Sequence, residues 1–571
     1  MLTLDPEQKL AGVLVPVFAL RGSGDLGVGD TVALREAISW TALQGLRVLQ
    51  ILPVNATGGD SSPYNLLSAM ALEPSTIATT PEELPDLSPR AFAEITAKYD
   101  LAGLRAGGVQ YREVERLKTE LLEAAWQNFQ AKPTFDREVR AWKDFVSEQV
   151  DWLPDHALHR ALIHWHGEDE KATDWPKEHR SPVAVRAWMA KMDPEARHDF
   201  ENRRDFYSYV QWVAFSQWRA VRAHADREGV ALMGDVPVGV SLHSTDVWSH
   251  PEIFDTVHSS GAPSEKVFAA DPFTEKWGQN WGFPLYDWSA MAKSDYAWWR
   301  RRLRLLMGIF HLLRVDHALG FFRIYSFPWR PEENQIYLPL NEEDASARAG
   351  GELPHFRDFP DDTEEHCSYN QKHGETLFRM LREEIGRHRL IAEDLGAVAP
   401  YVRPTLEDLE VPGFKIPQWE RAGDRLTPGA DYPRLSLATY ATHDHPPLRV
   451  LWEELFERAQ DPDQGTRDAA IHSQWELMNF CGQPEHELPQ AFTPEIHEIL
   501  LRGLLASNSW LTVPMITDLF GTAERFNVPG SASGENWTKR VVEPVAAWEK
   551  TWRERLEMWS RVRDETGRGR K

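Results

Sequence analysis

The stretch LLRVDHAL, residues 312–319, decides how the rest of the chain is interpreted. It runs apolar through Leu312 and Leu313, includes Arg314 and reaches Asp316 before the run breaks. This pattern is typical of a buried strand that ends in a charge. A buried arginine or carboxylate without a partner is strongly destabilising. Either the two charges therefore pair as a link between strands, or Asp316 faces a pocket at the strand's C-terminal edge, and the stretch alone leaves both interpretations open.

Apolar runs of this kind alternate with helical patterns along the chain. The runs are residues 13–19, 48–54, 231–238, 312–319, 390–396, 414–419, 435–444 and 511–521. Apolar residues at spacings of three and four predict helices between them, as in residues 30–46 and 295–310. Parallel strands need such crossovers, and eight units are the number in a closed (β/α)8 TIM barrel. We therefore predict an α/β fold of this type, with a doubly wound open sheet as the alternative.

Insertions interrupt the predicted barrel, which spans residues 1–565 as a single catalytic domain. Residues 80–230, between the second and third strands, are too long for a loop and predict an inserted helical subdomain. Residues 249–292 predict an aromatic loop insertion beside a substrate groove, and residues 335–375 a polar one. The tail, residues 566–571, is basic and is expected to be disordered.

A literal G-x-G-x-x-G lies between the first strand and the first helix, at Gly22, Gly24 and Gly27. In this position the motif is typical of a dinucleotide-binding loop. However, Asp25 and Asp30 would face the pyrophosphate, and the second strand does not end in a ribose-binding acid. We therefore expect these glycines to shape a loop and the protein to need no organic cofactor.

Composition excludes several classes of protein. Apolar residues make up 42% and charged residues 26% of 571 residues, as in ordinary globular proteins. The net charge of −24 argues against nucleic acid as a partner, because no basic surplus is available to neutralise phosphates. Cys367 and Cys481 form no disulfide framework, and no apolar run reaches 18 residues. The run from Leu10 to Leu20 contains Pro16 and follows acidic residues, so we do not expect it to be a signal peptide. We expect a cytoplasmic protein without membrane contact, and the sequence leaves its oligomeric state open.

Carboxylates gather at the ends of the predicted strands, where barrel enzymes carry their reactive groups. These are Asp235, Asp316, Glu393, Asp444 and Asp518. Crowded negative charges raise the pKa of at least one carboxyl, which suits a general acid, and Arg314, His317 and His443 supply compensating donors. One ionised and one protonated carboxyl, roughly 5 to 5.5 Å apart, cut glycosidic bonds with retention. The 24 tryptophans and 25 phenylalanines fit this reading, because flat rings stack on sugars, although they also serve as core.

Histidines offer two possible metal sites. One group lies in the helical insertion: His156, His159, His164 and His166. It has no carboxylate at ligand spacing. The cluster of His443, Asp444 and His445 would suit a metal-dependent barrel hydrolase, but no second His-x-His or bridging lysine stands at another strand end. We therefore expect no metal.

Several motifs resemble those of glycoside hydrolase family 77, the amylomaltases or 4-α-glucanotransferases. They are GDVPVGVSLHSTDVW (234–248), GQNWGFPLYDW (278–288), LLRVDHALGFFR (312–323), IAEDLGAV (391–398), ATHDHPPLR (441–449) and TDLFG…ERFNVPGSASGENW (517–537). A further stretch, SSPYNLLSAMALEP (61–74), is similar to the family's early S-P-Y…S-A motif. Together they follow the family order from near residue 13 to residue 540.

The resemblance implies a retaining 4-α-glucanotransferase that moves α-1,4-glucan segments between maltodextrins. It implies that Asp316 is the nucleophile, Glu393 the acid/base and Asp444 the carboxylate that holds sugar hydroxyls in the transition state. The substrate contacts it implies are Tyr64, Asp235, Gln279, Trp281, Arg314, His443 and Asn527, with Arg314 also keeping Asp316 ionised. An α-glucan hydrolase on the same site and a non-catalytic glycan-binding relative remain alternatives.

Two kinds of departure from the family pattern concern the acceptor side. Ala318 and Leu319 stand where many members have Phe and Arg, and HDHPP (443–447) replaces a more usual turn. The loops within residues 249–292 and 335–375 are also longer than is typical. These differences leave the predicted acids in place but leave the preferred acceptor and chain length open.

Overall fold

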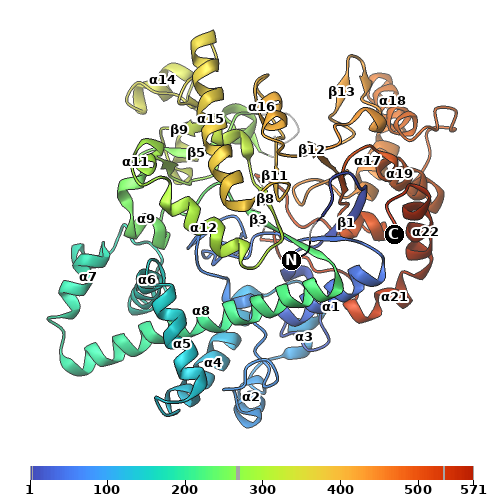
Figure 1. The fold of residues 1–571 in the computed structure, drawn as a ribbon. Coiled ribbons are helices and arrows are strands. Elements are labelled where there is room, and N and C mark those ends of the chain that lie inside the picture. Colours follow the sequence, from blue (N-terminus) through green and yellow to red (C-terminus); the bar gives the residue numbers. More distant parts are fainter. Residues whose placement is uncertain (1, 3, 265–270, 531–533, 570–571) are drawn as a thin grey trace.

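The computed structural model describes residues 2, 4–264, 271–530 and 534–569 (Figure 1). Eight parallel strands close into a barrel in the order β1-β2-β3-β8-β11-β12-β15-β16. They are β1 (Leu10–Leu14), β2 (Val48–Gln50), β3 (Ala231–Val236), β8 (Leu312–Val315), β11 (Leu390–Ala392), β12 (Gly413–Lys415), β15 (Ser436–Ala438) and β16 (Leu511–Thr512). Because β1 pairs with β16, the sheet has no free edge. The predicted (β/α)8 barrel is confirmed, and the open sheet was the wrong alternative.

The first strand begins and ends earlier than predicted. It covers Leu10–Leu14, whereas the apolar run predicted residues 13–19. Pro16 has no N–H for a strand ladder, and Val17–Ala19 form a 3-10 turn instead. The apolar pattern continues through this turn because Val17 and Ala19 are buried like the strand.

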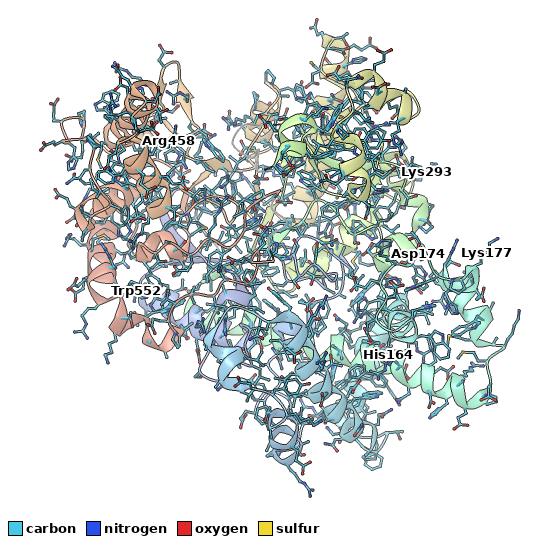
Figure 2. The ribbon with its side chains drawn as sticks, turned by 180° about the vertical axis from the view of Figure 1, so that it is seen from behind. His164, Asp174, Lys177, Lys293, Arg458 and Trp552 are labelled. Carbon is cyan, nitrogen blue, oxygen red and sulfur yellow. The ribbon has the colours of Figure 1, made fainter. Side chains whose placement is uncertain are left out.

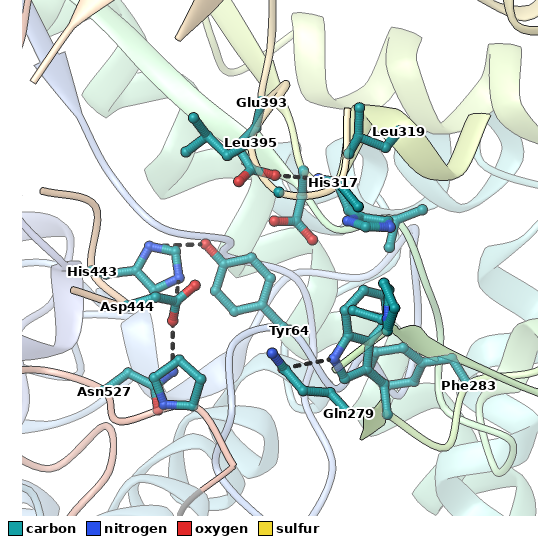
Figure 3. A pocket seen from close by; sticks show the side chains of 18 of the residues that line it. Tyr64, Gln279, Phe283, His317, Leu319, Glu393, Leu395, His443, Asp444 and Asn527 are labelled. Carbon is teal, nitrogen blue, oxygen red and sulfur yellow. Dashed lines mark hydrogen bonds and ion pairs between the residues drawn. The ribbon is translucent and has the colours of Figure 1, made fainter. Parts of the chain in front are cut away.

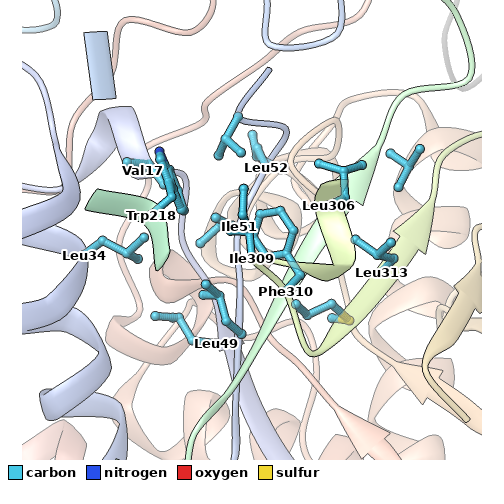
Figure 4. Packing of buried hydrophobic residues seen from close by; sticks show 14 of the residues in the cluster. Val17, Leu34, Leu49, Ile51, Leu52, Trp218, Leu306, Ile309, Phe310 and Leu313 are labelled. Carbon is cyan, nitrogen blue, oxygen red and sulfur yellow. The ribbon is translucent and has the colours of Figure 1, made fainter. Parts of the chain in front are cut away.

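A continuous apolar layer lies between the strands and their covering helices. Figure 4 shows part of this cluster, which includes Leu49 and Ile51 of the β2 segment, Leu34 of α1 (Thr31–Leu43) and Leu306 of α12 (Ala297–Met307). Each of these side chains is at most 1% exposed. Burial on this scale stabilises the barrel by about 25 cal/mol per Å² of apolar surface. The strand ends are therefore rigid supports for polar side chains.

Helices fill the long segment between β2 and β3. They are α2 (Pro89–Thr96), α3 (Leu101–Ala106), α4 (Tyr111–Gln130), α5 (Arg137–Glu148), α6 (Leu153–Trp165), α7 (Pro182–Met189) and α8 (Pro194–Glu228). The 35-residue α8 runs from this group back to the barrel, where it packs on α1 (Figure 1). The back view labels His164, Asp174 and Lys177 on the surface of this group (Figure 2). Its standing as a separate subdomain stays a prediction.

The two later insertions meet in one small antiparallel sheet of order β10-β9-β5-β6. Its strands are β5 (Ser259–Ala262), β6 (Gln279–Asn280), β9 (Ile324–Phe327) and β10 (His355–Arg357). The sequence treated residues 249–292 and 335–375 as separate loops. In the fold, β9 lies between β5 and β10 and joins them.

The remaining elements complete the outer layer. They are α9 (Thr245–Ser249), β4 (Phe254–Asp255), α10 (Pro272–Trp277), β7 (Leu285–Tyr286), α11 (Trp288–Ala292), α13 (Asn334–Tyr337), α14 (Glu342–Arg348), α15 (Glu364–Ile385), α16 (Val402–Asp408), β13 (Arg421–Ala422), β14 (Arg425–Leu426), α17 (Leu448–Arg458), α18 (Gln464–Phe480), α19 (Pro494–Ala506), α20 (Ile516–Phe520), α21 (Trp548–Thr551) and α22 (Arg553–Glu565). Among the described residues, none of the helices is both long and apolar enough to cross a membrane.

The start of the basic tail is ordered, contrary to the prediction. The side chain of Arg568 is fully buried and donates hydrogen bonds to the backbone oxygens of Leu505, Ser507 and Ser509. A cation at this place satisfies the carbonyl of Leu505 in the last turn of α19 and two carbonyls of the loop that follows. The expectation of disorder is therefore wrong for residues 566–569, and residues 570–571 lie outside the described part of the chain.

Candidate active site

A cavity of roughly 410 Å³ opens at the C-terminal ends of the barrel strands. The predicted site residues that line it are Tyr64, Gln279, Trp281, Asp316, Glu393, His443, Asp444 and Asn527. Arg314 and Asp235 are 2% and 1% exposed, and they lie behind the lining rather than in it. Residues from separate parts of the chain thus converge on one cavity, as Figure 3 shows.

Asp316 and Glu393 are held beside each other by the paired strands β8 and β11. The chain turns directly after Asp316, where His317 has a φ of 44° in the left-handed region. This turn directs the N–H of His317 at the Glu393 carboxylate, 2.8 Å away. The backbone of Glu393 is itself bonded on both sides, to Val315 and Ala318. The backbone segments that carry the carboxyl groups of Asp316 and Glu393 are therefore held in a fixed position relative to each other.

Arg314 lies behind the cavity lining and connects Asp235, Asp316 and Glu393. Its Nη1 donates to both carboxylate oxygens of Asp235, at 2.7 and 2.6 Å, and to Oδ1 of Asp316 at 3.1 Å. Its Nη2 lies 3.9 Å from Oε2 of Glu393. Both interpretations of the opening stretch are thus realised together, because Arg314 pairs with Asp316 while Asp316 faces the cavity.

Glu393 has the electrostatic environment of a proton donor. Burial raises the pKa of Glu393 well above its usual value, and the negative charges of Asp316 and Asp444 raise it further, against the opposing effect of Arg314. A carboxyl with a raised pKa keeps its proton closer to neutral pH, which general acid catalysis requires.

Asp444 has the opposite environment. Asn527 donates to its Oδ1 over 2.6 Å, and Nε2 of His443 lies 3.2 Å from the same oxygen. Although burial raises the pKa of Asp444, the neighbouring His443 and the Asn527 hydrogen bond outweigh it and hold the pKa well below the usual range. Arg525 also donates to the backbone oxygen of Asp444. Asp444 is therefore held in its ionised form, in which its oxygens can only accept hydrogen bonds.

Aromatic rings form the sides of the cavity. Tyr64 stacks on His443 with ring centroids 4.9 Å apart, and its hydroxyl donates to Asp235 over 2.7 Å. Trp281 meets His317 edge-on at 4.8 Å and donates to Gln279 over 3.2 Å. Flat rings of this kind offer stacking surfaces to sugar C–H faces.

Asp518 does not reach the cavity, which corrects the prediction for the eighth strand. It lies in α20, fully buried, where its Oδ1 accepts from the backbone N–H of Leu448 at the start of α17. Burial raises the pKa of Asp518 to about 7. The apolar run 511–521 predicted one long strand, but β16 ends at Thr512 and the rest turns into helix.

The sequence analysis did not single out several of the lining residues, among them Asp60, Phe356 and Trp537. Asp60 directly precedes the SSPY motif and Trp537 is the last residue of the final motif. These neighbouring motifs could therefore have pointed to both residues. Phe356 arrives on β10 from the 335–375 insertion, where no local pattern marks it.

The glycine motif of the first loop encloses a side chain of its own. The carboxylate of Asp25 accepts from the N–H groups of Gly22 and Gly27, each over 2.9 Å, and pairs with Arg540 over 2.9 Å. Asp30 caps the start of α1. The donors that a pyrophosphate would need are therefore occupied.

Neither histidine group forms a metal cluster in the described part of the chain, where no three potential ligands come together. His445 is bonded through Nδ1 to Thr442. In the insertion, His159 is bonded to Thr245 and His166 to His179. These histidines therefore support the local fold.

Comparison with known proteins identifies the family. Residues 15–544 match the model of glycoside hydrolase family 77, described as 4-alpha-glucanotransferase. The chain belongs to this family. It is therefore a glycosyl-transferring enzyme with a TIM barrel, which confirms the resemblance read from the motifs.

Relatives within the 4-α-glucanotransferase family match along nearly all of their length. The 4-alpha-glucanotransferase of Chlamydia pneumoniae is 29% identical over 542 residues, which cover 93% of this chain and 91% of that protein. The one from Thermus thermophilus is 28% identical over 535 residues, with coverage of 93% and 94%. The structure of an amylomaltase from Streptococcus agalactiae in complex with acarbose shares the fold, with a TM-score of 0.73 and 22% identity over 98% of this chain and 100% of that one.

Proposed function

We propose that this enzyme transfers α-1,4-glucan segments between maltodextrins by a retaining double displacement. The observation that supports this most strongly is the placement of Glu393, with its raised pKa, next to Asp316 on a neighbouring strand end in one cavity. One protonated and one ionised carboxyl on either side of a scissile bond are what retention requires.

In the first step Glu393 protonates the glycosidic oxygen and Asp316 attacks the anomeric carbon, which gives a covalent glucosyl-enzyme. Asp444 accepts hydrogen bonds from hydroxyls of the distorted sugar, with His443 and Asn527 holding its carboxylate in place. Contacts that strengthen in the transition state lower the barrier. Arg314 lies behind the cavity lining and holds Asp316 in position through a hydrogen bond, and Asp235 pairs with Arg314.

In the second step the 4-OH of an acceptor sugar attacks the anomeric carbon. Glu393, now a carboxylate, takes the acceptor's proton, and Asp316 leaves with the electrons of the ester bond. Transfer exceeds hydrolysis only when an acceptor occupies the place of water. Tyr64 and Trp281, which line the cavity with half-buried rings, offer surfaces for such an acceptor.

Incubation with maltotriose separates transferase from hydrolase. We expect chromatography to show glucose together with maltodextrins longer than maltotriose. Glucose and maltose alone would instead support the α-glucan hydrolase. Activity should survive a metal chelator, and its loss would favour the metal-dependent hydrolase, which uses a different nucleophile.

The nucleophile is tested by Asp316→Asn. Because an amide cannot form the glycosyl ester, we expect turnover of maltotriose to fall by about 10³-fold or more, with an unchanged melting temperature. The exposed Asp424→Asn serves as the control and should keep wild-type turnover. A wild-type rate in Asp316→Asn would contradict the assignment.

We also place the enzyme in the cytoplasm. Cys367 and Cys481 are both free thiols, as expected for a reducing compartment. Burial raises the pKa of Cys481 to about 12, so this thiol is unreactive. Fractionation of cells that produce the protein tests the location.

A further inference from the structure

Glu393 and Asp394 are consecutive residues directly after β11, and their side chains face opposite ways. Glu393 lines the cavity, whereas Asp394 is 1% exposed and is not part of the lining. Successive side chains of a strand point to opposite faces, and this alternation continues past the end of β11. The proposed acid/base therefore has a buried carboxylate as its direct neighbour in the chain, on the side of the protein interior.

The carboxylate of Asp394 joins β11 to β12. The two strands pair at Ala392 and Gly413, and the N–H of Ala392 donates to the carbonyl of Pro412. Further along, the N–H of Phe414 donates to Oδ1 of Asp394 over 2.6 Å. A hydrogen bond to an ionised acceptor is stronger than one to a neutral carbonyl. The side chain of Asp394 therefore extends the link between the two strands beyond the end of β11.

Gly413 leaves room for this carboxylate. A Cβ atom at residue 413 would lie 2.7 Å from Oδ1 and 2.8 Å from Cγ of Asp394. Both distances are well inside ordinary van der Waals contact, so a larger residue would push the carboxylate away from Phe414. Asp394 is therefore packed directly against the backbone of β12.

The second oxygen of Asp394 is held by a charge network. Nε of Arg403, on α16, donates to Oδ2 of Asp394 over 3.0 Å. The two terminal nitrogens of the same guanidinium donate to Glu420 over 3.2 and 3.0 Å, and Nζ of Lys415 lies 3.4 Å from the Glu420 carboxylate. Two carboxylates thus meet two cations, which compensates the buried charge of Asp394. With both oxygens bonded, this carboxylate has a fixed orientation.

Asp394 completes a clamp around the backbone of Glu393. On the β8 side, the N–H of Glu393 donates to Val315 and its carbonyl accepts from Ala318. On the β12 side, the next residue is anchored through Phe414. A general acid must lie within hydrogen-bond reach of the atom that it protonates, and a misplacement of about 1 Å can cost about 10²-fold in rate. On the basis of the proposed function, we infer that Asp394 is a positioning residue for Glu393.

Two variants of Asp394 measure this role. Asp394→Ala removes both contacts, so kcat for maltotriose should fall by about 50-fold, with KM changed by less than about threefold because the cavity lining remains. Asp394→Asn keeps an oxygen for the N–H of Phe414 and should recover about tenfold of this loss. Asp408→Ala, at an exposed carboxylate at the end of α16, is the matched control and should keep the wild-type kcat. A wild-type kcat in Asp394→Ala would overturn the inference.

An activated donor separates misplacement of Glu393 from general damage to the site. In α-maltotriosyl fluoride the leaving group is fluoride, a weak base that needs little help from a general acid. When Asp316 attacks the anomeric carbon, the carbon–fluorine bond breaks and its electrons leave with fluoride. The rate of the first-turnover burst of fluoride in Asp394→Ala should therefore stay within about threefold of wild type. Glu393→Gln, which lacks the proposed acid, should show the same difference between the two donors. An equal loss on both donors in Asp394→Ala would overturn the inference.

Arg403→Lys covers the case in which Asp394→Ala does not fold, which the melting temperature reports. Lysine keeps the positive charge but cannot contact Asp394 and Glu420 together. Turnover of maltotriose should therefore fall by about fivefold, while the fluoride burst is unchanged. In that case, wild-type turnover of maltotriose by Arg403→Lys would overturn the inference.

The wild-type enzyme keeps this inference and the proposed function apart. If the wild type forms no maltodextrins longer than maltotriose, the proposed function itself fails. If it forms them, and Asp394→Ala forms them equally fast, only the positioning role of Asp394 fails.

Discussion

The N–H of His317 donates to the carboxylate of Glu393 over 2.8 Å, across the strand pair β8 and β11. His317 adopts a φ of 44°, which few residues other than glycine accept, and this conformation points its N–H at Glu393. The turn that ends the strand of Asp316, the proposed nucleophile, thus positions Glu393, the proposed acid. Asp316 and Glu393 cannot shift independently while this bond is made.

Glu393→Gln should lower turnover of maltotriose by about 10²- to 10⁴-fold, because the amide cannot deliver a proton. The pKa of Glu393 is raised above 4.5, so wild-type kcat/KM should fall as pH rises through that higher pKa and Glu393 loses its proton. Kinetics across the pH range measure this basic limb. A variant that keeps the same limb would show that another group carries it.

Arg314→Lys should lower turnover by about 10²-fold and also destabilise the fold. One ammonium cannot reproduce the contacts of the guanidinium with Asp235 and Asp316, and Asp235 is buried. Breaking a buried pair costs about 3 to 5 kcal/mol, which urea unfolding would detect. Arg425→Lys, at an exposed arginine of β14, is the control and should change neither quantity. Unaltered stability of Arg314→Lys would mean that water replaces the lost contacts.

Asn527→Ala should shift the acidic limb of kcat/KM toward higher pH. The hydrogen bond from Asn527 helps to hold the pKa of Asp444 below its usual range, and its loss lets that pKa rise. Activity requires the ionised form of Asp444 in the proposed mechanism, so the variant loses activity sooner as pH falls. An acidic limb at the wild-type position would argue against a catalytic requirement for this carboxylate.

Asp518→Asn should stabilise the protein at neutral pH. The pKa of Asp518 is about 7 in the fold and about 3.9 when unfolded, so the native state binds more protons between these values and wild-type stability falls as pH rises through them. The full effect is about 4 kcal/mol, and asparagine can still accept from Leu448. Melting at pH 4 and pH 7, with the exposed Asp424→Asn as the control, should show a gain only at pH 7. Equal melting of wild type and variant at pH 7 would contradict the buried charge.

Local apolar patterns predicted the strands well where the buried run is itself the strand. The runs at 48–54, 231–238, 312–319 and 390–396 all contain barrel strands. The pattern misplaced the first strand, because the buried 3-10 turn after Pro16 is as apolar as a strand. Apolar periodicity reports burial, and burial is shared by strands, turns and short helices.

The same reasoning explains the one misplaced carboxylate. Asp316 and Asp518 both follow an apolar run, and the sequence treats them alike. Asp316 comes directly after β8 and faces the cavity, whereas the chain after β16 turns into α20 before it reaches Asp518. The length of a strand depends on its partners in the barrel, which local sequence does not contain.

By itself the sequence determined the barrel and the family, because both are marked by patterns of residues that are close in the chain, and it predicted which carboxylates act as the acids. Tertiary structure alone decided that Arg314 bridges Asp235 and Asp316, that the two later insertions share one sheet, and that the N–H of His317 reaches Glu393. Each of these contacts joins segments that are far apart in the chain. Only the closed barrel brings them within reach, and hydrogen bonding, desolvation and pKa all depend on such distances.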